Sequence, residues 1–218
     1  NLGDAGPQTS STWLLLMKSD EERSWQSNRG YDDAPGSYYS YDSNVGRHLQ
    51  LAEGDLVVIR EDDYIVGCGV IEHVSKGPAE KEILRCPFCQ STNHYPRSTV
   101  SPESRFRCSD CKAEFAELER TWTEVVEYRA HYADTWRPLA KPLHRIAIED
   151  ALTTKDTFNA IRPLDRAKLP DVLEAADHFD WTDWINEDVS RLTSEIAGGL
   201  TEGKSKARIG QVHFRQAL

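Results

Sequence analysis

Four of the five cysteines in this chain form two CxxC pairs, and this pattern predicts a metal site. The pairs Cys86/Cys89 and Cys108/Cys111 are separated by 18 residues. Each CxxC turn places two thiolates on one side, so the two turns together supply four sulfurs to one tetrahedral Zn²⁺ ion. Four cysteine ligands leave no open position for water, so we expect a structural zinc rather than a catalytic one. His94 is an alternative ligand, but it has no paired partner, and we expect it in solvent.

A tyrosine-rich segment upstream of the cysteines suggests a second kind of chemistry. Aromatic rings can sandwich a flat nucleobase, and a neighbouring carboxylate or amide can read its hydrogen-bonding edge. This interpretation requires rings that wall a cavity open to solvent; the alternative is that the tyrosines fill a core. We predict that the rings of Trp25, Tyr39 and Tyr41 stack on a base and that Asp42, Ser43 and Asn44 read its edge.

The charge distribution limits how the chain can hold a nucleic acid. A net charge of −10 argues against a grip by the whole surface. The segment Lys76–Lys112 nevertheless holds seven basic and four acidic residues, and residues 200–218 hold four basic and one acidic residue. A solvated face explains each segment equally well. Where phosphate is bound, we expect contacts from Arg47, His48, Arg97 and Arg105.

Length and composition are typical of a soluble protein with one good core and a smaller satellite. No apolar run reaches the roughly 18 residues that cross a bilayer. CxxC pairs without a signal peptide indicate a reducing cytoplasm. We interpret residues 1–11 as a tag or disordered leader. No phosphate-binding glycine loop and no convincing nucleophile–base pair occurs, so we expect that these 218 residues alone do not cleave DNA.

Apolar patterning predicts strands in the first two-thirds of the chain and helices in the last third. The class is therefore α+β, a small barrel with a zinc ribbon inserted at 84–116 and with C-terminal helices. Gly67 and Gly69 indicate a close approach of backbone, and Cys68 between them is expected in the core. Trp122 and Trp136 are also expected in the core. We predict strands at 12–18, 54–62, 64–74 and 122–139, a long loop at 19–43, and helices at 169–179 and 181–200.

Several segments, taken in order, resemble an EVE domain of the PUA-like superfamily. They are a first strand led by Trp13, a Gly-Arg element at Asn44–Leu49, a Gly-Asp turn at Glu53–Val58, a glycine-bearing strand at Val66–Val70, and a late strand at Phe158–Leu164. The resemblance covers residues 12–178, interrupted by the ribbon, with a helix following at 179–200. It implies a PUA-like barrel. The chain departs from the family pattern at Gly46-Arg47-His48, which lacks the usual Asn, and in the zinc insert.

The last residues carry a second resemblance. Arg208–Leu218 resembles the lead-in helix that precedes many HNH nuclease domains, so residues 201–218 are expected to be a linker and the start of such a domain. Together the two resemblances imply the N-terminal part of a modification-dependent (type IV) restriction endonuclease. In such an enzyme, a specificity domain binds double-stranded DNA and accepts a flipped methylated or hydroxymethylated cytosine, and an HNH domain cuts the DNA. They also allow a homodimer formed through that HNH domain.

Two other functions fit the same residues. PUA-like barrels also bind RNA, and nothing in the sequence separates RNA from duplex DNA. A zinc-stapled module for protein or small-molecule interaction is the second alternative. A basic groove beside the tyrosine cluster would favour nucleic acid, whereas an acidic groove would favour the interaction module.

Overall fold

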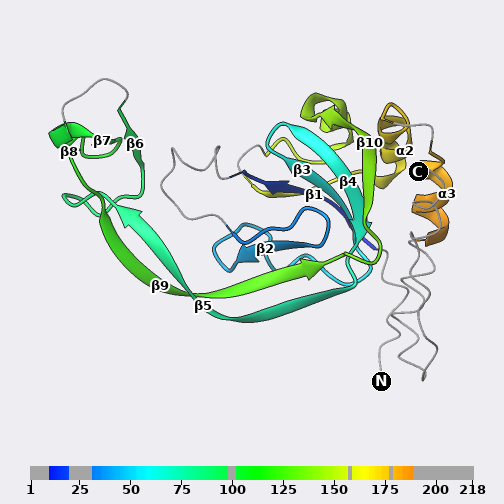
Figure 1. Cartoon of the computed structure of the whole chain (residues 1–218), viewed down its shortest axis with the longest axis horizontal. Coiled ribbons are helices and arrows are strands. Elements are labelled where there is room, and N and C mark those ends of the chain that lie inside the picture. The colour runs from blue at the N-terminus through cyan, green and yellow to red at the C-terminus, as the bar shows by residue number, and fades with distance from the viewer. Residues whose placement is uncertain (1–9, 20–30, 98–101, 157–158, 177–178, 189–218) are drawn as a thin grey trace, which may run out of the picture.

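The computed structural model of the chain describes residues 10–19, 31–97, 102–156, 159–176 and 179–188. They form a body of packed sheets and short helices, from which a long two-stranded arm extends (Figure 1). Every helix in this described part is too short and too polar to cross a lipid bilayer.

The body is built on a five-stranded sheet with strand order β10-β4-β3-β1-β11. Its central strands β1 and β3 are parallel neighbours, and the other pairs are antiparallel. Both central strands are near-continuous apolar runs, TWLLLM and LVVIRE, because side chains on both faces of the sheet are buried. The strands are β1 (Thr12–Met17), β3 (Leu56–Glu61), β4 (Tyr64–Val70), β10 (Arg137–His144) and β11 (Ile161–Pro163).

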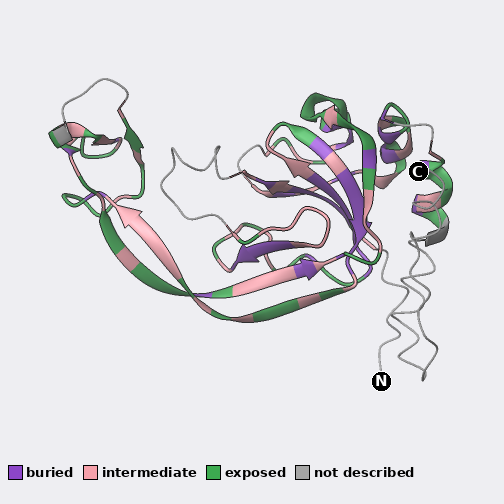
Figure 2. Cartoon of the chain, viewed as in Figure 1, coloured by how far each residue is buried: buried purple, intermediate pink, exposed green. Residues whose placement is uncertain are grey.

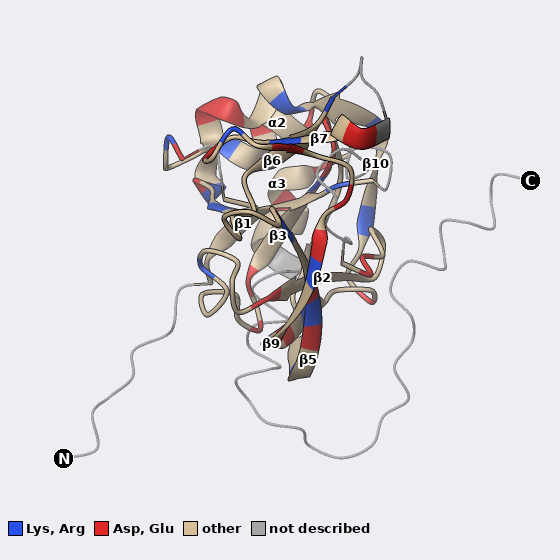
Figure 3. Cartoon of the chain, turned by 90° about the vertical axis from the view of Figure 1, so that its left-hand side faces the viewer, with Lys and Arg blue, Asp and Glu red and all other residues tan. Residues whose placement is uncertain are grey.

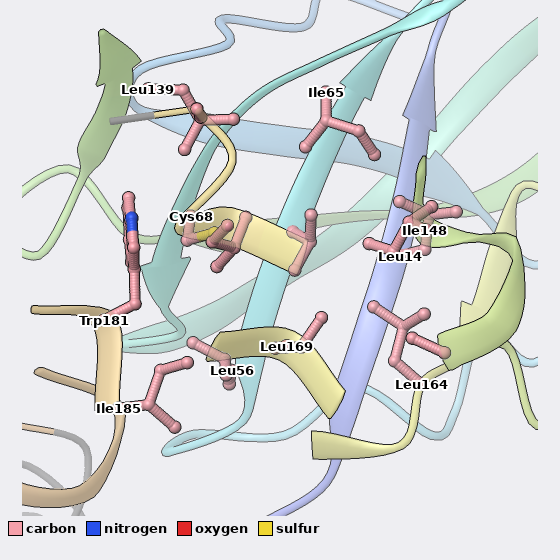
Figure 4. Packing of buried hydrophobic residues seen from close by; sticks show 14 of the residues in the cluster. Leu14, Leu56, Ile65, Cys68, Leu139, Ile148, Leu164, Leu169, Trp181 and Ile185 are labelled. Atoms are coloured by element: carbon pink, nitrogen blue, oxygen red, sulfur yellow. The ribbon is translucent and has the colours of Figure 1, made fainter. Parts of the chain in front are cut away.

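Short helices cover one face of this sheet. Leu14 and Leu56 project from β1 and β3 onto Leu169, Trp181 and neighbouring apolar side chains of the helices (Figure 4). The helical segments are η2 (Arg145–Ala151), η3 (Arg166–Lys168), α2 (Leu169–Leu173), α3 (Trp181–Asp183) and the π-helical turn η4 (Trp184–Asp188).

The opposite face of the sheet packs on a second sheet with order β2-β9-β5. Its strands are β2 (Tyr38–Asp42), β5 (His73–Arg85) and β9 (Glu119–His131). β5 and β9 pair along all 13 residues, whereas β2 pairs only with the last five residues of β9. The remainder of β5 and β9 therefore runs past the body as a ribbon, which we call the arm. Its side chains are mostly exposed or half-buried, in contrast to the body (Figure 2).

The far end of the arm carries the cysteines. A third sheet, β6-β7-β8, lies there and belongs to neither of the other two (Figure 1). We call this tip, residues 86–97 and 102–118, the knuckle. Its elements are β6 (His94–Pro96), the turn η1 (Pro102–Ser104), β7 (Phe106–Cys108) and β8 (Glu114–Phe115).

Several sequence predictions are confirmed. The α+β class holds, with far more strand than helix. The strands predicted at 54–62 and 64–74 are present as β3 and β4, and they form a hairpin in whose turn Asp62 takes a φ of 49°. Cys68 is fully buried. At Gly67 a Cβ would lie 2.4 Å from the ring of Trp136, so backbone and indole approach as closely as the glycines indicated.

Other expectations differ from the structure. Among the described residues the strands form three separate sheets and not one closed barrel, because the chain changes sheet at Ile71–Glu72 and at residues 132–136 without a connecting ladder. The loop expected at 19–43 contains β2. The helix expected at 169–179 ends at Leu173, since only Leu169 and Leu173, one turn apart, bury large side chains. Residues 1–9 of the leader, 189–200 of the last helix and 201–218 lie outside the described residues.

Two motifs behind the family resemblance contact each other in the body. The indole N–H of Trp13 donates to the carboxylate of Asp55 at 2.8 Å, and backbone N–H groups of Ser11 and Ala52 donate to the same carboxylate. The Trp-led strand and the Gly-Asp turn are thus linked by a buried carboxylate, which ties the start of β1 to the start of β3. Their presence is explained by folding and does not identify a ligand.

Candidate metal centre and nucleic-acid interface

The four cysteines of the knuckle have the geometry of a tetrahedral metal site. The Sγ atoms of Cys86, Cys89, Cys108 and Cys111 all lie within 4.8 Å of one another. The Cys86–Cys111 and Cys89–Cys108 sulfurs are 3.7 Å and 3.5 Å apart. A tetrahedral zinc with Zn–S bonds of about 2.3 Å separates its sulfurs by about 3.8 Å, so the donor set and its spacing fit Zn²⁺.

The two CxxC turns repeat the same backbone conformation. In the first, the N–H of Gln90 donates to the carbonyl of Cys86 and Gln90 takes a positive φ of 62°. In the second, Lys112 donates to the carbonyl of Cys108 with φ 65°. Backbone N–H groups of Cys111 and Asp110 hold the pKa of Cys108 below its ordinary value, which favours the thiolate that binds metal, whereas the pKa of Cys89, beside the other three sulfurs, is raised. This repeat positions two thiolates from each turn.

His94 is not a fifth ligand candidate in this geometry. Its Nε2 lies 3.0 Å from the carbonyl of Leu84, and its ring packs on the edge of Phe106. It joins the knuckle to the end of β5, which differs from the solvated position that the sequence suggested.

Tyr39 and Tyr41 lie in the core, which corrects their assignment as base-stacking rings. They are 2% and 0% exposed. Tyr41 stacks with Tyr39 at 5.6 Å and with Tyr128 at 5.2 Å between ring centroids. The cause is the alternation of β2: both tyrosines point between the two sheets, while Tyr38, Ser40 and Asp42 point to the other face. A base cannot stack on rings that have no exposed face.

Asp42 is the centre of a buried polar network. Its carboxylate accepts hydrogen bonds from Lys81 Nζ at 2.5 Å, from the Tyr31 hydroxyl at 2.7 Å and from the Asn44 backbone N–H at 2.8 Å. Burial opposes ionisation, but these hydrogen bonds outweigh it and hold the pKa of Asp42 below its ordinary value. Burial and the bond to Asp42 raise the pKa of Tyr31. Asp42 therefore fixes Tyr31 and Lys81 and has little capacity left for a base edge.

The Tyr31 and Lys81 side chains border a hollow of about 240 Å³ on the arm, which we call the arm hollow. Ala79, Val125 and Trp122 also line it, and the Trp122 side chain is 61% exposed. The full lining also includes Asp32, Asp42, Glu80, Glu82, Glu127 and Arg129. Five carboxylates against two cations make this lining acidic. Along the visible strands of the arm, Figure 3 shows acidic and basic residues in alternation.

Ser43 and Asn44 lie at the end of β2, beside the arm. The Ser43 hydroxyl accepts from the backbone N–H of Val126 at 3.2 Å, and Ser43 lines a wider, open depression of about 610 Å³ along the arm. The Asn44 side chain is exposed. These two predicted base-edge residues are therefore accessible, whereas Asp42 is enclosed. Trp25 lies outside the described residues.

The predicted phosphate contacts have mixed outcomes. Arg47 donates to the Asp156 carboxylate at 3.2 Å and to the Ile161 carbonyl at 3.0 Å, so its guanidinium ties two loops together. His48 binds the Val45 carbonyl and packs on Tyr128. Both side chains are half-buried, and their polar groups bind the protein itself, so they are not positioned to contact a DNA phosphate. Arg97 and Arg105 lie on the knuckle, where Arg97 pairs with Glu114 and Arg105 is exposed.

Sequence reasoning missed the residues that border the arm hollow, above all Trp122 and Lys81. Trp122 was expected in the core. The run Glu80-Lys81-Glu82 contains three consecutive charges, which a strand can carry only if neither face is buried. Trp122 pairs with Glu82 across the arm, a register that the sequence does not show, so the sequence holds no signal for the exposed tryptophan. By contrast, Trp136 packs in the body as expected.

Comparison of the chain with protein-family models, with curated proteins and with solved structures finds no match.

Proposed function

We propose that this chain is a DNA-binding specificity module, and that the arm hollow receives a flipped, modified cytosine. The observation that carries the proposal is that an exposed tryptophan, Trp122, and a tyrosine, Tyr31, both line the same hollow. Stacking on an aromatic side chain is worth about 1–3 kcal/mol per base. The hollow thus combines ring surface with fixed hydrogen-bonding groups, which a base reader needs.

By the criterion drawn from the sequence, the acidic lining counts toward the interaction module; within the proposed DNA-binding function it is compatible with a base but not with a phosphate. Carboxylates accept hydrogen bonds from the exocyclic amino group of cytosine. Glu82 and Glu127 already accept from Arg120 and Arg129, so each would have to offer its other oxygen. Lys81, held by Asp42 and Tyr31, has one further N–H donor for a base carbonyl. A flipped base projects away from its own backbone, so the carboxylates in the hollow need not face the phosphates.

The identity of the modified base and of the whole protein rests on the family resemblance. On that basis the body is a PUA-like domain of EVE type, and the parent protein is an HNH endonuclease. A methyl group adds about 0.8 kcal/mol of apolar burial, so discrimination requires close fit as well.

A protein-interaction module is the second candidate, and one observation favours it. The excess of carboxylates in the arm hollow, together with Trp122 and Tyr31, would suit a lysine or arginine side chain of a basic peptide. Lys81 Nζ already lies 4.8 Å from the centroid of the Tyr31 ring, which shows that this ring accepts a cation.

Replacing Trp122 with alanine separates these candidates. We expect Trp122→Ala to weaken binding of duplex DNA with the preferred modified cytosine about 5- to 150-fold, because one stacking contact is lost. Unmodified duplex should bind with nearly unchanged affinity. Fluorescence anisotropy at one fixed salt concentration measures both.

Tyr64→Ala is the matched control, since Tyr64 is an exposed aromatic residue on the body, away from the hollow. It should leave both affinities unchanged. Unaltered discrimination by Trp122→Ala would contradict the proposed site. Loss of binding to a lysine-rich peptide, with DNA binding unaffected, would support the interaction module instead.

A further inference from the structure

The knuckle sheet has two faces of opposite character. In β6-β7-β8 one face packs over the cysteines: Cys108, Phe106 and Phe115 lie there among buried or half-buried apolar side chains. Because side chains alternate along a strand, the residues between them must project to the other side. That outer face has no element packed on it in the described part of the chain.

The outer face gathers arginines around a tyrosine. Tyr95 is directly opposite Arg107 in the β6–β7 ladder, so the two side chains share a face. The ladder continues by one hydrogen bond, from the Arg97 N–H to the Arg105 carbonyl at 2.8 Å, which places Arg97 and Arg105 on the same face. Arg107 is in turn opposite Glu114 on β8.

This face is open and cationic. Tyr95 is 41% exposed, the Arg107 side chain is 40% exposed, and Arg105 is also exposed. In the strand register, Glu114 is the one carboxylate on this face. It pairs with Arg97, and its Oε1 lies 4.0 Å from Nη1 of Arg107. Three guanidinium groups against one carboxylate leave an excess of two positive charges, in a chain whose net charge is −10.

We propose that the outer face of the knuckle sheet is a second, separate binding surface that contacts the phosphodiester backbone of DNA. Arg105 and Arg107 contact phosphates, Tyr95 donates its hydroxyl to a phosphate oxygen, and Glu114 holds Arg97 and Arg107 in place. Guanidinium groups suit this task because their donors match phosphate oxygens in pairs. The naming of DNA as partner rests on the proposed function.

Zinc explains why this surface can exist at the end of an arm. The strands of the knuckle contain three, three and two residues, too few to hold arginine side chains in register without support. The four cysteines stabilise the opposite face of the same sheet. Under this proposal the metal has no chemical step; it supports a rigid phosphate-binding face away from the acidic arm hollow.

The test is the salt dependence of binding to unmodified duplex DNA, in which the arm hollow has no modified base to read. We expect the double variant Arg105→Ala/Arg107→Ala to lower the slope of log K against log salt by about 1.8, from two lost phosphate contacts. Arg105→Lys/Arg107→Lys should restore the slope, because lysine also neutralises phosphate. Lys141→Ala/Lys155→Ala, which removes two exposed charges from the body, is the matched control and should leave it unchanged.

Zinc content and circular dichroism confirm that each variant is folded. An unchanged slope in the alanine double variant, an equal decrease in the control, or no binding of the wild-type chain to unmodified duplex would overturn the inference. Tighter binding to an RNA duplex of the same sequence would overturn DNA as the partner. If the slope falls as expected but modified and unmodified duplexes bind equally, the knuckle surface stands and the proposed base-reading function fails.

Discussion

Replacing Cys108 with serine is expected to abolish zinc binding and unfold the knuckle, while the body stays folded. Among the described residues of the knuckle, its apolar cluster has Cys86, Cys108 and Phe115 as buried members, with three half-buried neighbours. Such a cluster cannot offset the conformational entropy of more than 25 residues, whereas structural zinc contributes an apparent 10–16 kcal/mol of binding free energy. The body has its own two cores on the faces of the five-stranded sheet.

Two measurements check this expectation. Zinc content should fall from one ion per chain to none, and amide hydrogen exchange should become fast in the knuckle but not in β1 or β3. Cys68→Ala is the matched control: Cys68 is a buried thiol of the body, so this variant should lose stability but retain its zinc. One bound zinc in Cys108→Ser, or unfolding of the body with the knuckle, would contradict the account.

Substitutions of Tyr41 are expected to affect stability strongly and in opposite directions. Tyr41→Ala removes a fully buried ring that stacks with Tyr39 and Tyr128, and should lower the free energy of unfolding by about 3–5 kcal/mol. The Tyr41 hydroxyl is buried without a hydrogen-bond partner among the described residues. Tyr41→Phe keeps the ring and removes that oxygen, so it should raise the free energy of unfolding by about 1 kcal/mol.

Urea unfolding of the wild-type chain and the two variants measures these differences. Tyr41→Phe should also bind modified DNA as the wild type does, because the ring does not face the arm hollow. A large loss of DNA discrimination in a stably folded Tyr41→Phe would return Tyr41 to the binding site and contradict the core assignment.

The sequence predicts best the features that depend on local pattern. The CxxC spacing predicts the metal site because four thiolates at that spacing have few other structural uses, and the apolar runs of β1, β3 and β4 predict buried strands. The turn at Asp62 and the close packing at Gly67 follow from local backbone requirements. Apart from the partner of Gly67, the distant Trp136, each of these depends on residues near one another in the chain.

Features set by long-range pairing could not be predicted in the same way. The run Tyr38–Asp42 contains no aliphatic residue, so its sequence predicts part of a polar loop. Pairing with β9 makes the run a strand, and the alternation of that strand places Tyr39 and Tyr41 in the core. The arm depends on β5 and β9 continuing past the body, and only the charges at Glu80–Glu82 indicate this. Arg47 and His48 were misplaced because their partners, Asp156 and Tyr128, lie more than 75 residues away in sequence.

The most direct test of the central claim is binding of the wild-type chain to duplexes that differ at a single cytosine. The duplexes carry unmodified, methylated or hydroxymethylated cytosine, and an RNA duplex of the same sequence is measured alongside at the same ionic strength. The account predicts at least one modified duplex bound about fourfold or more tightly than the unmodified one, as burial of a single methyl group provides. Equal affinity for all three DNA duplexes, or preference for the RNA, would contradict it.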